Sequence, residues 1–169
     1  MKRVLSLLTC FALVGCAGYK LGPTNGLPAG TRSVQVNVFH NKVLEEPRLS
    51  EAITSALRKQ LQQDGTFTLD TRNEGDIVVN GTIVKYDRAG LSYQPQDILT
   101  PRDYRITMFA LVTARERATG KVLMNNRRIR GHTTVRIGND LTTAERQSIP
   151  LLAEDMARNI TALLADGEW

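Results

Sequence analysis

Cysteine and histidine, the residues that most often bind metals or act as nucleophiles and bases, are scarce in this sequence. It contains two of each: Cys10, Cys16, His40 and His132. No paired Asp/Glu motif accompanies them, and no glycine-rich phosphate loop follows a predicted strand. The sequence therefore offers no metal site or nucleophilic triad, and we predict that the protein is not an enzyme and uses no cofactor.

Long hydrophobic runs are also lacking, with one exception near the N-terminus. Residues 4–14 are almost all apolar and follow two basic residues, but the run is shorter than the about 20 residues of a membrane-spanning helix. It ends in residues 13–16, LVGC, which resemble the lipobox of bacterial lipoproteins. An ordinary secretory signal with a chance cysteine is the alternative.

The lipobox resemblance implies that residues 1–15 are a signal peptide that is removed, and that Cys16 is the lipid attachment site. Acyl chains contribute about 0.8 kcal/mol per buried methylene, so three of them would anchor the protein stably. Position 17 is Ala. In lipoproteins of this kind Asp at that position retains the protein in the inner membrane, so Ala favours the outer membrane, on its periplasmic side. Because Cys10 leaves with the signal, no disulfide is expected.

Removing 15 residues from 169 leaves 154, enough for one domain with its own core. Residues 16–32 are rich in Gly and Pro, and we interpret them as a flexible tether behind the lipidated N-terminus. Residues 33–169 are predicted to form a single α+β domain. Its charge is modest, with 20 basic and 17 acidic residues after the signal is lost.

Alternating polar and apolar residues predict the strands of this domain. In the first, Val34, Val36 and Val38 share a face. Gly81 is expected at a bulge or bend of a later strand. Residues 87–102 contain two prolines and are interpreted as a long loop. The predicted strands cover residues 33–39, 66–70, 76–86, 103–117 and 122–137, with a hairpin turn at 118–121.

Two helices are predicted from apolar residues at helical spacing. The first begins near Pro47, carries Leu49, Ile53, Leu57 and Leu61, and ends at Asp64-Gly65. The second carries Ile149, Leu152, Met156, Ile160 and Leu163. It starts at a capping box of Thr142 and Glu145, or at Ser148 before Pro150. One apolar stripe on each helix predicts a two-layer α+β sandwich: a mostly antiparallel sheet of four to five strands with both helices on one face.

Several short motifs together resemble the LptE family of lipopolysaccharide (LPS) assembly lipoproteins. The family typically starts Cys-Gly-aromatic-basic-Leu, and residues 18–21 match this after an extra Ala17. Further matches are LSEA at 49–52, DYRITM at 103–108 and EDMA at 154–157. The resemblance implies an outer-membrane protein that plugs the LptD β-barrel, binds LPS and assists its delivery to the outer leaflet.

Two groups of residues fit that role. Phe109 and Leu111 fall on the sheet face that the helices should not cover, so we expect them to face the partner; isolated surface apolar residues are the alternative. Arg128, Arg130 and Arg136 share a strand face and could bind the phosphates of lipid A. The family uses the loop before the last helix for LPS contact, which singles out Arg136. A solvated basic face is the alternative.

Other functions stay open at this point. A periplasmic auxiliary lipoprotein of an ABC-type lipid transporter would share the anchor, fold and size, and a structural envelope lipoprotein would need no ligand. A basic strand could also suit nucleic acid. The lipobox, however, would place the protein where nucleic acid is not the usual ligand, so none is expected.

Overall fold

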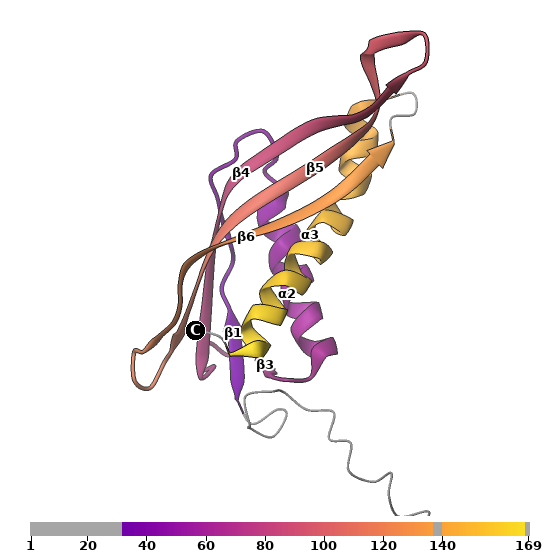
Figure 1. Ribbon diagram of the computed structural model, residues 1–169. Helices are drawn as coiled ribbons and strands as arrows, with labels where there is room; N and C mark the ends of the chain where they lie inside the picture. The colour runs from indigo at the N-terminus through magenta and orange to yellow at the C-terminus, as the bar shows by residue number, and fades with distance from the viewer. Residues whose placement is uncertain (1–31, 137–139, 168–169) are drawn as a thin grey trace, which may run out of the picture.

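The structure is a computed structural model that describes residues 32–136 and 140–167. Figure 1 shows the arrangement of the strands and helices. In chain order they are β1 (Ser33–Val36), β2 (His40–Asn41), α2 (Leu49–Asp64), β3 (Thr68–Asp70), β4 (Ile77–Gln94), β5 (Asp97–Glu116), β6 (Val122–Arg136) and α3 (Leu141–Asp166). Neither α2 nor α3 is both long and apolar enough to cross a membrane. The lipobox, Cys16 and the tether up to residue 31 lie outside the described residues.

The strands form one mixed sheet in the order β3-β1-β4-β5-β6, with β2 beside β4. β1 runs parallel to β3 and β4, and β2 runs parallel to β4. The long strands β4, β5 and β6 are antiparallel neighbours. The predicted α+β sandwich is confirmed, but the sheet has six strands instead of four or five. Its parallel part arises because the chain crosses over through α2 between β1 and β3.

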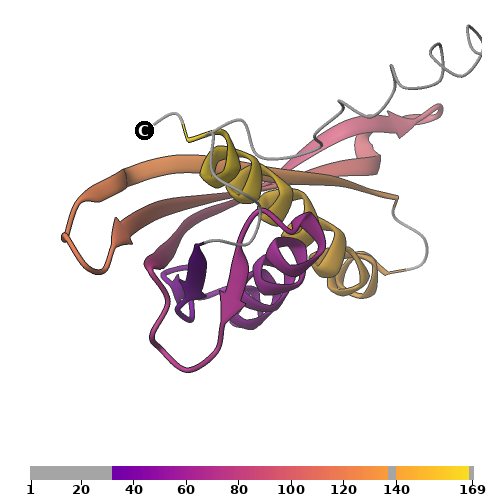
Figure 2. The same ribbon diagram turned by 90° about the horizontal axis from the view of Figure 1, so that it is seen from below.

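Both helices lie on the same face of the sheet, as predicted, and pack against each other (Figures 1 and 2). The predicted apolar stripes form the core with the inner face of the sheet. One position differs, because Leu164 is fully buried whereas Leu163 is only partly buried against the core. Continued four-residue spacing from Met156 and Ile160 favours Leu164, which therefore completes the stripe.

The first predicted strand, over residues 33–39, breaks after Val36. Val34 and Val36 are buried as predicted, but Val38 is 69% exposed and Phe39 is buried instead. Because the phenylalanine ring removes more apolar area from water than a valine side chain, breaking the strand to bury Phe39 strengthens the core.

Gly81 provides the space that the Phe39 ring occupies. A Cβ at position 81 would overlap the ring, and Gly81 itself stays in regular register with Val112 on β5. The predicted bulge at Gly81 is therefore wrong, and the register shift of β4 comes later, between Ile83 and Lys85. The glycine at this position permits close approach of an aromatic ring.

The predicted loop over residues 87–102 is also wrong, because β4 continues to Gln94 and β5 already begins at Asp97. The two strands pair up to their ends and form a hairpin that projects beyond β6 (Figure 1). Proline is tolerated here because this hairpin has irregular register, with Pro101 opposite Tyr93 between register shifts.

Helix α3 starts differently from either predicted start. The carboxylate of Asp140 accepts hydrogen bonds from the backbone N–H of Thr142, at 3.0 Å, and of the following residue. Asp140 is therefore the N-cap, and the predicted capping box of Thr142 with Glu145 is wrong. The alternative start at Ser148 is wrong too, since Pro150 lies inside the continuous helix.

Helix α3 packs closely on the edge strand β6. A Cβ at Gly131 would lie 2.8 Å from the Met156 Cβ and 2.9 Å from its backbone nitrogen, so only glycine allows this approach. Asp155 accepts a hydrogen bond from the backbone N–H of His132 at 2.9 Å, and Asn159 donates one to a β6 carbonyl at 2.8 Å. The helix thus satisfies backbone groups that an edge strand otherwise exposes.

Candidate functional site

The face of β4, β5 and β6 opposite α2 and α3, here the outer face, holds Phe109 and Leu111. Alternation along β5 places them there, since the intervening Met108, Ala110 and Val112 are fully buried on the helix side. Phe109 and Leu111 are themselves half-buried. The outer face therefore has an apolar centre, as the sequence predicts.

Cationic side chains flank this centre. The guanidinium carbon of Arg128 lies 4.3 Å from the Phe109 ring centroid, and the Lys85 Nζ lies 6.0 Å from it. Such contacts are favourable because the ring face carries partial negative charge. Lys85 also forms a 2.5 Å ion pair with Asp87. The sequence analysis missed Lys85, because the register shift after Ile83 changes which β4 side chains face outward.

Arg128 and Arg130 extend this cationic rim on the neighbouring strand. In the β5–β6 register Leu111 lies opposite Arg128 and Phe109 lies opposite Arg130. Each apolar site residue is therefore the cross-strand neighbour of an arginine. Within residues 32–136 and 140–167, neither arginine forms an ion pair with an acidic side chain. Their charges are therefore available to an anionic ligand or partner.

Arg136 differs from the other two arginines. It lies at the far end of β6, opposite Asp103, and its Nε forms a 3.0 Å ion pair with the Asp103 carboxylate. Hydrogen bonds from the Ser92 hydroxyl and from Arg136 hold the pKa of Asp103 below its usual value. The structure thus separates Arg136 from the Phe109 cluster, and at neutral pH its charge is already balanced.

His132 and Thr134 alternate with the arginines along β6, but neither belongs to the basic cluster. His132 is half-exposed, and its Nδ1 lies 3.3 Å from Asp155 on α3, so the ring contacts the helix layer at the sheet edge. Thr134 pairs with Arg105 on β5. The basic cluster on the outer face therefore centres on Arg128 and Arg130.

The projecting β4–β5 hairpin exposes apolar side chains that the loop interpretation missed. Leu91 is 43% exposed, Tyr93 49% and Leu99 85%. The alternation of Leu91 and Tyr93 with polar residues was a usable strand signal in the sequence. Exposed apolar residues on a projecting element are typical of a contact surface.

The base of this hairpin is fixed to α3 by Arg88, which lies in the segment predicted as a loop. The Arg88 Nε donates a short hydrogen bond to the Glu145 carboxylate, and its Nη1 lies 3.7 Å from Glu45. Burial and the nearby Glu145 raise the pKa of the adjacent Tyr86 to about 12. Arg88 therefore connects the hairpin to α3, and its charge is paired with carboxylates.

Metal ligands are not gathered in the described part of the chain, where no cluster of three or more His, Cys, Asp or Glu residues could hold an ion. What the outer face does present is a half-buried aromatic and aliphatic centre with guanidinium groups beside it. This arrangement suits binding of an amphiphilic or anionic partner.

Solved structures share this fold with the chain. A protein from Xanthomonas campestris matches with a TM-score of 0.62 and 8% identity, over 88% of this chain and 91% of its own. A hypothetical protein from Chlamydia trachomatis matches with 0.56 and 11% identity, over 79% and 95%. Rare lipoprotein B from Shewanella oneidensis matches with a TM-score of 0.44 and 14% identity, over 77% of this chain and 90% of its own. At these identities the first two show the shared fold alone.

Sequence comparison identifies the family. No curated protein matches the chain. Residues 31–164, however, match the LptE family, described as lipopolysaccharide-assembly, and this match spans all elements from β1 through most of α3. This protein therefore belongs to the LptE family of LPS-assembly lipoproteins.

Proposed function

We propose that this protein is an outer-membrane lipoprotein, anchored through Cys16, that plugs the LptD β-barrel and binds LPS for delivery to the outer leaflet. The observation that carries the proposal is the outer face, where half-buried Phe109 and Leu111 lie beside arginines that form no ion pair with the described residues. Membership of the LptE family supports the LPS-assembly role. The role is one of binding and assembly, without catalysis.

The apolar centre fits contact with a protein wall better than contact with water. A β-barrel lumen offers alternating side chains that can pack on Phe109 and Leu111. Arg128 and Arg130 supply the main part of the proposed LPS contact, because guanidinium groups bind the phosphates of lipid A in a bidentate manner, and Arg136, which is already paired with Asp103, adds less. Protein and lipid would thus share one face of the sheet.

The plug proposal predicts that replacing Phe109 and Leu111 together with Asp weakens association with LptD by at least tenfold. Two carboxylates would have to be desolvated against the partner, which costs free energy. Co-purification of LptD with the tagged double variant, quantified against wild type, measures the effect. We expect the variant chain to keep its circular dichroism spectrum.

A matched control changes two exposed apolar residues away from the outer face. Leu44 is 95% exposed and Leu151, on α3, is 57% exposed. The Leu44→Asp/Leu151→Asp variant should co-purify with LptD as wild type does. Equal recovery of both double variants would contradict the proposed interface, and an early thermal transition of the Phe109/Leu111 variant would place those side chains in the core.

The identity of the partner is tested independently of the mutations. A C-terminal affinity tag on the full chain should recover a large β-barrel protein from detergent-solubilised membranes. Recovery of an ATPase complex without a barrel would contradict the proposal and support an auxiliary lipoprotein of an ABC-type lipid transporter.

The anchor proposal predicts that Cys16→Ala abolishes lipid addition and leaves uncleaved precursor. The thiol is the only group at that position that can accept the diacylglyceryl chain, and cleavage follows acylation. Intact mass spectrometry of the variant should show the precursor mass without lipid. Wild type should fractionate with the outer membrane on a sucrose gradient. An unchanged mature mass in the variant would refute lipidation at Cys16.

A further inference from the structure

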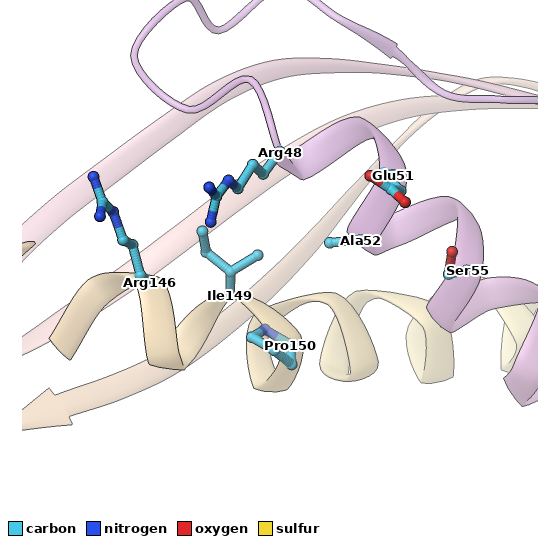
Figure 3. A pocket seen from close by; sticks show the side chains of 7 residues that line it. All are labelled: Arg48, Glu51, Ala52, Ser55, Arg146, Ile149 and Pro150. Carbon is cyan, nitrogen blue, oxygen red and sulfur yellow. The ribbon is translucent and has the colours of Figure 1, made fainter. Parts of the chain in front are cut away.

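A cavity of about 500 Å³ lies in the groove between the N-terminal halves of α2 and α3, away from the outer face. Figure 3 shows side chains from both helices around it. Arg48 and Glu51 come from the start of α2, and Arg146 and Ile149 come from α3. The groove therefore combines charged walls with an apolar side chain.

Neither arginine of this groove forms an ion pair within residues 32–136 and 140–167, although the charge of Arg146 helps to lower the pKa of Asp140. Two carboxylates close to them in the sequence, Glu145 and Glu45, are paired with Arg88 instead. Glu51 is the one acidic residue that lines the cavity.

A second cavity along the same interhelical groove makes the contrast clear. It has about 200 Å³ and is lined by Lys59, Glu154 and Arg158 among others. There Lys59 lies 3.6 Å from Glu154, and Arg158 lies 3.0 Å from Asp155. Charges in that part of the groove balance one another, whereas neither arginine of the larger cavity forms an ion pair with any residue that the structure describes.

The walls of the larger cavity limit what could bind there. Ala52 is small, and Ile149 and Pro150 provide an apolar surface beside the arginines (Figure 3). Two guanidinium groups on different helices can each form paired hydrogen bonds to the oxygens of a tetrahedral anion. An apolar wall next to them accommodates the carbon atoms that such a group carries.

We propose that the groove between α2 and α3 is a phosphate-binding site, with Arg48 and Arg146 as its two ligands. The phosphate is either that of a lipid headgroup or free inorganic phosphate, and both present the same oxygens. The site is separate from Arg128, Arg130 and Arg136 and does not depend on the function proposed above. Glu51 opposes the bound charge and keeps the affinity modest.

The test is titration of the ¹⁵N-labelled full chain, in a non-ionic detergent without phosphate groups, with inorganic phosphate and with phosphatidic acid dissolved in micelles of the same detergent. Amide resonances of α2 and α3 around the groove should shift and saturate. The Arg48→Gln/Arg146→Gln variant should bind at least tenfold more weakly. Folding should survive, because both arginines are exposed and Arg48 makes no side-chain cap hydrogen bond.

Two further variants separate a built site from general charge attraction. Arg72→Gln/Lys121→Gln removes two exposed cations elsewhere and should bind phosphate as wild type does. Glu51→Gln removes the opposing carboxylate and should bind several-fold more tightly. Both results support the site, whereas an equal loss of affinity in the two double variants would overturn it.

The two probes distinguish the source of the phosphate. Saturation by both inorganic phosphate and phosphatidic acid supports a site for the bare phosphate group, and saturation by phosphatidic acid alone supports a lipid headgroup site. Saturation by neither probe overturns the proposal. Charge reversal at Arg128 and Arg130 should leave these titrations unchanged, so failure here and failure of LPS binding at the outer face are distinguishable.

Discussion

Replacing Gly81 with alanine is expected to lower the free energy of unfolding by about 2–3 kcal/mol, because it forces an extra carbon into a packed core. The new Cβ would overlap the Phe39 ring, which is 1% exposed and fills the space above Gly81. The backbone of β4 is fixed by pairing with β2 and β5, so the ring has to leave the core instead. Urea unfolding followed by circular dichroism measures the loss.

A double-mutant cycle attributes the loss to this contact. Phe39→Ala alone should cost about 3–5 kcal/mol, as for other large-to-small changes in a core. Once the ring is absent, adding Gly81→Ala should cost almost nothing further, because the methyl group then fills part of the cavity. Gly120→Ala, at a positive φ of 69° with open space around it, should cost only about 1 kcal/mol. Additive losses at Gly81 and Phe39 would refute the proposed contact.

The parts of the fold that the sequence predicts are those with long, regular periodicity. The alternation of β5 from Ile106 to Ala114 and the four-residue spacing of Leu49, Ile53 and Leu57 each leave one possible buried face. Both helices and the inner face of the long strands follow from this. Short segments have too few repeats to define a buried face. Tertiary packing therefore decides that the first strand breaks and that Phe39 is buried instead of Val38.

The missed features depend on contacts between residues distant in the chain. Asp140 rather than Thr142 caps α3, and Glu145 turns to Arg88, which is 57 residues earlier. The hairpin over residues 87–102 contains prolines that argue against a strand, yet cross-strand pairing with its own second half sustains it. Rules based on local sequence describe the propensity of each residue but not its contacts with residues distant in the chain.

The candidate site shows the same division. Phe109 and Leu111 are placed by alternation alone, and the sequence predicts their face correctly. Lys85 lies on the same face as Phe109 only because of a register shift in β4. The charge of Arg136 is balanced only because the β5–β6 register places Asp103 opposite it. Which arginines keep an available charge is therefore a property of strand register, which the sequence alone does not specify.

Charge reversal of Arg128 and Arg130 to Glu is expected to weaken LPS binding by at least tenfold. Hydrogen bonds to charged groups contribute about 1.5–3 kcal/mol each, and neither arginine has an acidic partner in the described chain to soften the loss. Arg136→Gln should have a smaller effect, because its guanidinium is already paired with Asp103 at 3.0 Å. The affinity of the full chain in neutral detergent for LPS, measured at two ionic strengths, gives these values.

Lysine at both positions should restore part of the binding, since the charge remains while the planar guanidinium is lost. Reversal of Arg72 and Lys121, which changes the net charge equally at exposed positions elsewhere, is the matched control and should bind LPS nearly as wild type does. Wild-type affinity should fall as salt rises, because exposed ion pairs are screened. Equal affinities of the wild type and the Arg128/Arg130 variant would mean that these arginines form only a solvated face. LPS contact would then have to be sought at the projecting hairpin, where Arg102 and the apolar Leu99 are both exposed.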